Sequence, residues 1–154
     1  SKAQGLPGLR TGWLVVRDSQ LNQDILNWKF YTSICSPAPS EQLALAALRA
    51  KNVLEQRNVE KINRNIGIAE LFFARWKELF NWRAPRAGSV GLAEIHVPSA
   101  TAFCHRLAKE AGIVLLPSKF FRFGDNHVRF GLGRNDFPDA IKGFEEYLLN
   151  QKTL

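Results

Sequence analysis

Residues 90–116, VGLAEIHVPSATAFCHRLAKEAGIVLL, decide the fold class because the hydrophobic pattern changes twice within them. Val90–Val97 has the composition of a β-strand, and Ile113–Leu116 has that of a short buried strand. Between them, Ala100–Ala111 has the periodicity of an amphipathic helix, and Gly112 stands where a helix commonly ends in a left-handed residue. This order predicts a small sheet that is covered by helices.

The residues that follow extend this predicted domain. Phe120–Phe123 and Val128–Leu132 are predicted strands on either side of Gly124–Asn126, which is a turn signal. Pro138–Asn150 is predicted to be a last helix, capped by the aspartate two residues before it. The expected fold class is therefore α/β, with a small C-terminal domain, residues 83–154, that is α+β-like and contains a mixed sheet.

The region before residue 83 is organised differently. Leu9–Val16 is predicted to be a mostly buried strand, and a helix is predicted from Asp18 or Ser19 to about Tyr31. From Glu41 to about Trp82 the pattern is helical, with a bend expected near Arg57–Asn58. Since so long a helix is rare in a compact domain, it is interpreted as a strut between two parts of a molecule. The predicted division is residues 1–40, 41–82 and 83–154.

The composition of the 154 residues is that of a globular protein, with 45% hydrophobic and 23% charged residues. The net charge of +7 leaves an anionic partner open, but no block of like charges marks a binding tail. Cys35 and Cys104 lie far apart, which favours reduced thiols in a cytoplasmic protein over a disulfide framework. No apolar run has the length of a membrane span, so no membrane partner is expected.

Two arginines are the most informative polar residues. Arg10 and Arg129 each lie in a predicted apolar strand, where a guanidinium needs a carboxylate partner or an anionic ligand. The planar donor fork of arginine fits a phosphate or a carboxylate. From the residues alone, a salt bridge or an outward-facing position stays open for Arg129. The three histidines, by contrast, have no spacing that predicts a metal site; they are His96, His105 and His127.

The first twelve residues contain a motif, Ser1-Lys2-x-x-Gly5-Leu6-x-Gly8-x-Arg10-x-Gly12. It resembles the active-site signature of the class I/II aminotransferases, which are pyridoxal-phosphate enzymes of fold type I. The spacing of eight residues from Lys2 to Arg10 matches that signature. Three later segments resemble further parts of the family in the family's order; they are SPAPSEQLALAAL (36–48), PRAGSVGLAEI (85–95) and GIVLLPSKFF (112–121) followed by HVRFGLGR (127–134).

The resemblance implies roles for four residues. Lys2 would be the lysine that binds pyridoxal phosphate covalently and moves a proton between substrate and cofactor carbons. Ser1 and Arg10 would bind the cofactor's phosphate, and Arg129 would hold the α-carboxylate of the substrate. The reaction implied is transfer of an amino group between an amino acid and a 2-oxo acid.

The family's phosphate loop, stacking aromatic ring, pyridine-binding aspartate and nearby tyrosine lie upstream of its lysine, and no segment here corresponds to them. The resemblance therefore implies the C-terminal part of such an enzyme: the final strand and helix of the large domain, a connecting helix and the small domain. This chain alone is expected to be inactive and not to bind pyridoxal phosphate. The intact enzyme is expected to be a cytoplasmic homodimer. Thr11, Ala87 and Val90 depart from the family's pattern and leave the substrate specificity open.

Two alternatives stay open. Because the same scaffold also supports β-elimination and decarboxylation, the parent enzyme could be a lyase or a decarboxylase. A basic RNA-binding α/β module that uses Arg122, Arg129 and Arg134 is the alternative from another class. The order of aromatic residues and glycines around these arginines differs from that of an RNA-recognition strand, so nucleic acid is not the expected partner.

Overall fold

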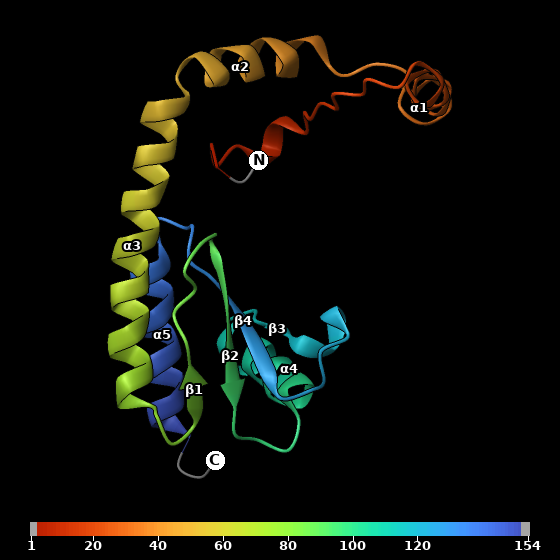
Figure 1. Cartoon of the computed structure of the whole chain (residues 1–154). Coiled ribbons are helices and arrows are strands. Elements are labelled where there is room, and N and C mark those ends of the chain that lie inside the picture. The colour runs from red at the N-terminus through yellow and green to blue at the C-terminus, as the bar shows by residue number, and fades with distance from the viewer. Residues whose placement is uncertain (1–2, 152–154) are drawn as a thin grey trace. The chain divides into compact units, whose positions relative to one another are not determined.

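The computed structural model describes residues 3–151 (Figure 1). The chain has a mixed α/β fold, as the sequence predicts. It divides into two compact units, Ser1–Gln56 and Arg57–Leu154. Helix α3, Lys51–Arg75, contributes residues to both units. None of the helices within residues 3–151 is both long and apolar enough to cross a membrane.

The second unit contains a four-stranded sheet with the strand order β1-β2-β4-β3. The strands are β1 (Phe80–Trp82), β2 (Val90–Ile95), β3 (Leu116–Pro117) and β4 (His127–Gly131), and every neighbouring pair is antiparallel. The prediction of a mixed sheet was therefore wrong. Strands β2 and β3 do run in the same direction on either side of a helix, but β4 lies between them and pairs with both.

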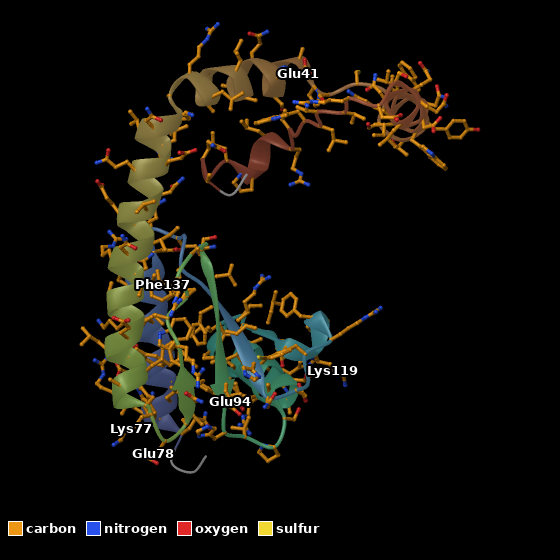
Figure 2. The ribbon with its side chains drawn as sticks, viewed as in Figure 1. Glu41, Lys77, Glu78, Glu94, Lys119 and Phe137 are labelled. Carbon is orange, nitrogen blue, oxygen red and sulfur yellow. The ribbon has the colours of Figure 1, made fainter. Side chains whose placement is uncertain are left out.

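Helices cover one face of this sheet. The α4 helix (Ala100–Ala111) begins and ends where the sequence predicts, because the Ser99 hydroxyl accepts from Ala102 N and Gly112 adopts a φ of 67°. The α5 helix (Phe137–Asn150) starts one residue earlier than predicted. Figure 2 labels Phe137 at this start. The largest fully buried hydrophobic side chains come from α3, α4, α5, β2, β4 and the segment after β4; they are Phe72, Phe103, Phe144, Ile95, Leu107, Leu132 and Val128.

The helix predicted over residues 41–82 is interrupted and shorter. It consists of α2 (Ala38–Arg49) and α3, which are separated at Ala50, whereas α3 continues unbroken through Arg57–Asn58. After α3, the amides of Leu79 and Phe80 both donate to the carbonyl of Trp76, and β1 follows. The predicted helix extended too far because the large apolar residues of β1 continue the three- and four-residue spacing of α3. The helix also starts inside the Pro-rich segment, since Pro39 lies in its first turn, where proline is tolerated.

The strand predicted at Leu9–Val16 was wrong. The first unit contains a 3-10 turn, η1 (Pro7–Leu9), then an extended segment outside any sheet, and then α1 (Ser19–Thr32), which Asp18 caps as predicted. A β-strand needs a neighbour for its backbone groups, and no described residue of this unit forms one. Trp13 and Trp28 are 65% and 71% exposed, and no side chain between residues 3 and 56 is buried.

The strands predicted at Ile113–Leu116 and Phe120–Phe123 also need correction. Only Leu116 of the first segment belongs to β3, and residues Ser118–Phe121 form a 3-10 turn, η2. The turn is closed by Arg122, which has a left-handed φ of 55°, and by a bond from Phe123 N to Ser118 O. The aromatic residues of this segment therefore lie on a turn beside β4 and do not belong to the sheet.

Asp125 ties the loop between η2 and β4 to the start of α4. Its carboxylate accepts from the hydroxyls of Ser99 and Thr101 and from Thr101 N, and its backbone carbonyl accepts from Ala100 N. The hydrogen bond from Ser99, followed by that from Thr101, lowers the pKa of Asp125 below its usual value. The stabilisation is therefore complete above the ordinary pKa of an aspartate and is lost as the pH falls through the lowered pKa.

Acidification from about pH 7 to about pH 3 should thus reduce the urea midpoint of the wild type more than that of Asp125→Asn, which cannot ionise at this position. Glu70→Gln removes an exposed carboxylate on α3 and is the matched control. If acidification lowers the urea midpoints of Asp125→Asn and Glu70→Gln by the same amount, the ionised carboxylate of Asp125 makes no specific contribution to stability.

Candidate functional site: an unpaired arginine on the open face of the sheet

Arg129 lies in the middle of β4, and its neighbours along the strand determine where its side chain points. Val128 is 0% exposed and Phe130 is 3% exposed, so both face the helices. Because successive side chains of a strand point to opposite faces, Arg129 lies on the face away from the core. Leu92 on β2 and Leu116 on β3 are its partners in register and flank it on that face.

No carboxylate among residues 3–151 forms a salt bridge with Arg129. The contact that the guanidinium does make is with an aromatic ring, since its Cζ lies 5.1 Å from the centroid of Phe121. Of the two arrangements that the sequence leaves open for Arg129, the structure shows the outward-facing one, and no salt bridge is formed with any residue of 3–151. The guanidinium keeps its N–H donors available for an anion.

A cleft of about 630 Å³ lies beside Arg129. Its charged lining residues are Arg129, Arg134 and Asp136, and the last two pair with each other through Nε–Oδ1 at 2.7 Å and Nη2–Oδ2 at 2.5 Å. Pairing with Arg134 lowers the pKa of Asp136. Since that pair is internally neutral, Arg129 supplies the uncompensated positive charge of the cleft. The rest of the lining is mostly apolar and reaches from Leu116, which flanks Arg129, to the core residues Phe130 and Phe144.

Asn65 fixes the segment that follows β4, and sequence reasoning missed it. It is fully buried on α3, and its Nδ2 donates to the carbonyl oxygens of Leu132 and Arg134, at 2.8 Å each. One amide thus anchors the chain between β4 and α5, and with it the end of the strand that carries Arg129. The available signal was an asparagine between Ile62, Ile66 and Ala69, on the apolar face of a predicted helix.

The second predicted anion ligand, Arg10, lies in the first unit and is not buried. It follows η1 in a left-handed conformation, with a φ of 53°, and its Nη1 donates to the carbonyl of Pro7 at 3.3 Å. The expectation of a guanidinium inside an apolar strand was wrong, because that strand does not form. An exposed guanidinium that has no carboxylate partner within residues 3–151 still fits a phosphate group. Ser1 and Lys2 lie outside the described residues.

The remaining candidates have structural surroundings. His96 Nδ1 lies 2.9 Å from the carbonyl oxygen of Glu78, and His127 Nδ1 lies 2.9 Å from Asn126 Oδ1. Burial raises the pKa of the Cys104 thiol to about 11, so it stays protonated at neutral pH. Within residues 3–151 no three His, Cys, Asp or Glu side chains are arranged to hold a metal ion.

The family model described as aminotransferase class I and II matches residues 1–136. Capreomycidine synthase from Streptomyces vinaceus is 25% identical over 150 residues, which are 96% of this chain and 38% of that protein.

Two solved structures show the same fold. A PLP-dependent aminotransferase from Streptococcus suis 89-1591 superposes with a TM-score of 0.82 at 24% identity, over 97% of this chain and 40% of its own. The PLP-dependent cyclase OrfR superposes with a TM-score of 0.83 at 24% identity, over 97% of this chain and 41% of its own. The chain thus spans about two-fifths of the length of the proteins that it matches.

Proposed function

The chain belongs to the class I and II aminotransferases, and from that premise we propose that it is the C-terminal part of an enzyme that moves an amino group between an amino acid and a 2-oxo acid. Residues 1–40 would belong to the large cofactor-binding domain, residues 41–82 to the connection and residues 83–154 to the small domain. The active enzyme would be a cytoplasmic homodimer. The observation that carries the proposal is Arg129, an arginine without a carboxylate partner among the described residues, on the open face of the sheet.

Arg129 would hold the α-carboxylate of the substrate. A guanidinium presents two parallel N–H donors to a carboxylate, which fixes the orientation of the carboxylate as well as its position. Because β4 pairs with a strand on each side, the backbone of Arg129 is held in place before the substrate arrives. Binding the carboxylate in this way orients the adjacent Cα–H bond, which is the bond that transamination breaks.

The cofactor end of the site would be formed by Ser1, Lys2 and Arg10. Arg10 and Ser1 would bind the phosphate of pyridoxal phosphate, and the Lys2 amine would accept the proton from the substrate's Cα and return it at a neighbouring carbon. When bound, pyridoxal phosphate supplies an electron-withdrawing ring that makes the Cα proton acidic. By this proposal, residues upstream of Lys2 in the native protein complete the site, so the isolated chain would be inactive.

Other reactions of the same cofactor are a second candidate. Capreomycidine synthase and the cyclase OrfR are named for chemistry other than simple amino transfer, and both match nearly the whole of this chain. An elimination, cyclisation or decarboxylation would use Arg129 and Lys2 in the same positions. The family assignment argues against the RNA-binding alternative.

The proposal is tested on the native protein that carries this chain. After loading with pyridoxal phosphate and reduction with borohydride, peptide mapping should find the pyridoxyl group on Lys2. The Lys2→Ala variant should carry none there, and Lys51→Ala, which removes an exposed lysine of α3, should behave like the wild type. A pyridoxyl group distributed over several lysines would refute the role of Lys2.

The same preparation separates the two candidate reactions. Amino transfer needs a 2-oxo acid acceptor, so turnover should require pyruvate or 2-oxoglutarate. Release of ammonia or carbon dioxide without an acceptor would identify a lyase or a decarboxylase instead.

A further inference from the structure

We propose that Phe121 is a positioning residue for Arg129: its ring holds the guanidinium at the open face of the sheet, ready for a carboxylate. This inference rests on the proposed function, because it takes the carboxylate of the substrate as the ligand of Arg129. It assigns a role to a residue that sequence reasoning had placed in a strand.

The contact between the two side chains is close and partly exposed. Cζ of Arg129 lies 5.1 Å from the centroid of the Phe121 ring, within the range of a cation–π interaction. Phe121 is 44% exposed, so the ring contributes little to the hydrophobic core. An exposed aromatic residue whose described contact is with a cation is explained better by that cation than by packing.

The ring itself is held firmly to the strand that carries Arg129. Phe121 is the last residue of η2, and the fully buried Ser118 begins that turn. The Ser118 hydroxyl donates to the carbonyl of Gly124 at 3.0 Å and accepts from His127 N, in β4, at 3.2 Å. The turn that presents Phe121 is thus bonded to β4 two residues before Arg129.

An aromatic partner suits this task better than a carboxylate. The long side chain of arginine loses rotamer freedom when a ligand fixes it, so a neighbour that restrains it in advance favours binding. An aspartate or glutamate would restrain the guanidinium too, but it would occupy the N–H donors that the substrate needs. A ring attracts the cation through its face and accepts no conventional hydrogen bond, so the donors stay available.

The adjacent aromatic residues provide controls within the same turn. Phe120 is 71% exposed, and Phe123 contacts the ring of His127, with centroids 5.0 Å apart. Neither has a described contact with Arg129. Phe120→Leu therefore repeats the chemical change of Phe121→Leu one residue away.

The experiment uses the native protein with arginine side chains labelled for NMR and acetate as the carboxylate probe. In Phe121→Leu, the Arg129 guanidinium resonance should lose its ring-current shift, and acetate should bind about two- to thirtyfold more weakly. Phe121→Tyr keeps a ring and should restore both the shift and the affinity, and Phe120→Leu should change neither. In steady-state assays, Phe121→Leu should raise the KM for the amino acid more than it lowers kcat.

The outcomes separate this inference from the proposed function. If acetate shifts the Arg129 resonance equally in wild type and in Phe121→Leu with the same affinity, the positioning role is refuted while Arg129 keeps its place as the carboxylate ligand. If acetate leaves the Arg129 resonance of the wild type unchanged, the role proposed for Arg129 fails, and the inference about Phe121 falls with it.

Discussion

Replacing Asn65 by leucine is expected to lower the free energy of unfolding by about 2–4 kcal/mol. The two side chains are similar in size, but leucine cannot donate to the carbonyls of Leu132 and Arg134, which Asn65 reaches at 2.8 Å each. Leu132 is fully buried, so its carbonyl would lose its partner out of reach of water. Urea denaturation of the wild type and the variant measures the difference.

Two further variants test whether the amide donors are responsible. Asn65→Asp keeps the shape and places an acceptor against the same carbonyls, so it should destabilise at least as much. Asn63→Leu makes the same leucine substitution at an exposed position of α3 and should stay within about 0.5 kcal/mol of the wild type. An Asn65→Leu protein as stable as Asn63→Leu would show that the buried amide is dispensable.

Gly91→Ala should lower the free energy of unfolding by about 1–3 kcal/mol, because β2 passes directly beneath the indole of Trp82. A Cβ at Gly91 would lie 2.2 Å from Cη2 and 2.7 Å from Cζ3 of that ring. The ring cannot simply move aside, since it stacks on Phe73 with centroids 4.5 Å apart and planes 18° apart. The variant must displace the indole or bend the strand, and near-UV circular dichroism should report the lost environment of Trp82.

Gly67→Ala is the matched control for this substitution. Gly67 lies inside α3, and a Cβ there meets no atom within 4 Å, so the alanine should stabilise the helix by about 0.5–1 kcal/mol. Combining Gly91→Ala with Trp82→Leu should cost less than the sum of the single changes, because the smaller side chain removes the clash. Strict additivity would mean that Gly91 is needed for a reason other than Trp82.

The helices with strong end signals were predictable from the sequence, whereas the pairing of the strands was not. The bounds of α4 were predicted correctly because Ser99 and Gly112 mark both ends locally. Whether a short apolar segment becomes a strand depends on a neighbour elsewhere in the chain, which explains why Leu9–Val16 was predicted as a strand and is not one. The position of β4 between β2 and β3 is likewise a property of the whole sheet.

The sequence predicted the arginine of the candidate site, Arg129, but not the residues that hold it and its strand in place. An arginine within an apolar strand stands out in the sequence, and Arg129 is indeed a strand residue without a carboxylate partner in the described part of the chain. The contact of Phe121 with Arg129 depends on a turn that the sequence pattern does not predict. A polar residue on the apolar face of a predicted helix marks Asn65 as unusual, but its partners, Leu132 and Arg134, are distant in sequence and cannot be inferred locally. Arg10 was expected to lie inside an apolar strand, and that expectation failed because the strand, which needs a partner elsewhere in the chain, does not form.

The alternation along β4 has a consequence for how such a protein can change over generations. Val128 and Phe130 carry the packing against the helices, while the residue between them is free of the core. Under the proposed function, a mutation at Leu92, which lies beside Arg129 on the open face, would therefore change the surroundings of the bound carboxylate without disturbing the core. Alternate positions of β4 thus meet separate physical demands, packing for Val128 and Phe130 and solvent-side chemistry for the residue between them.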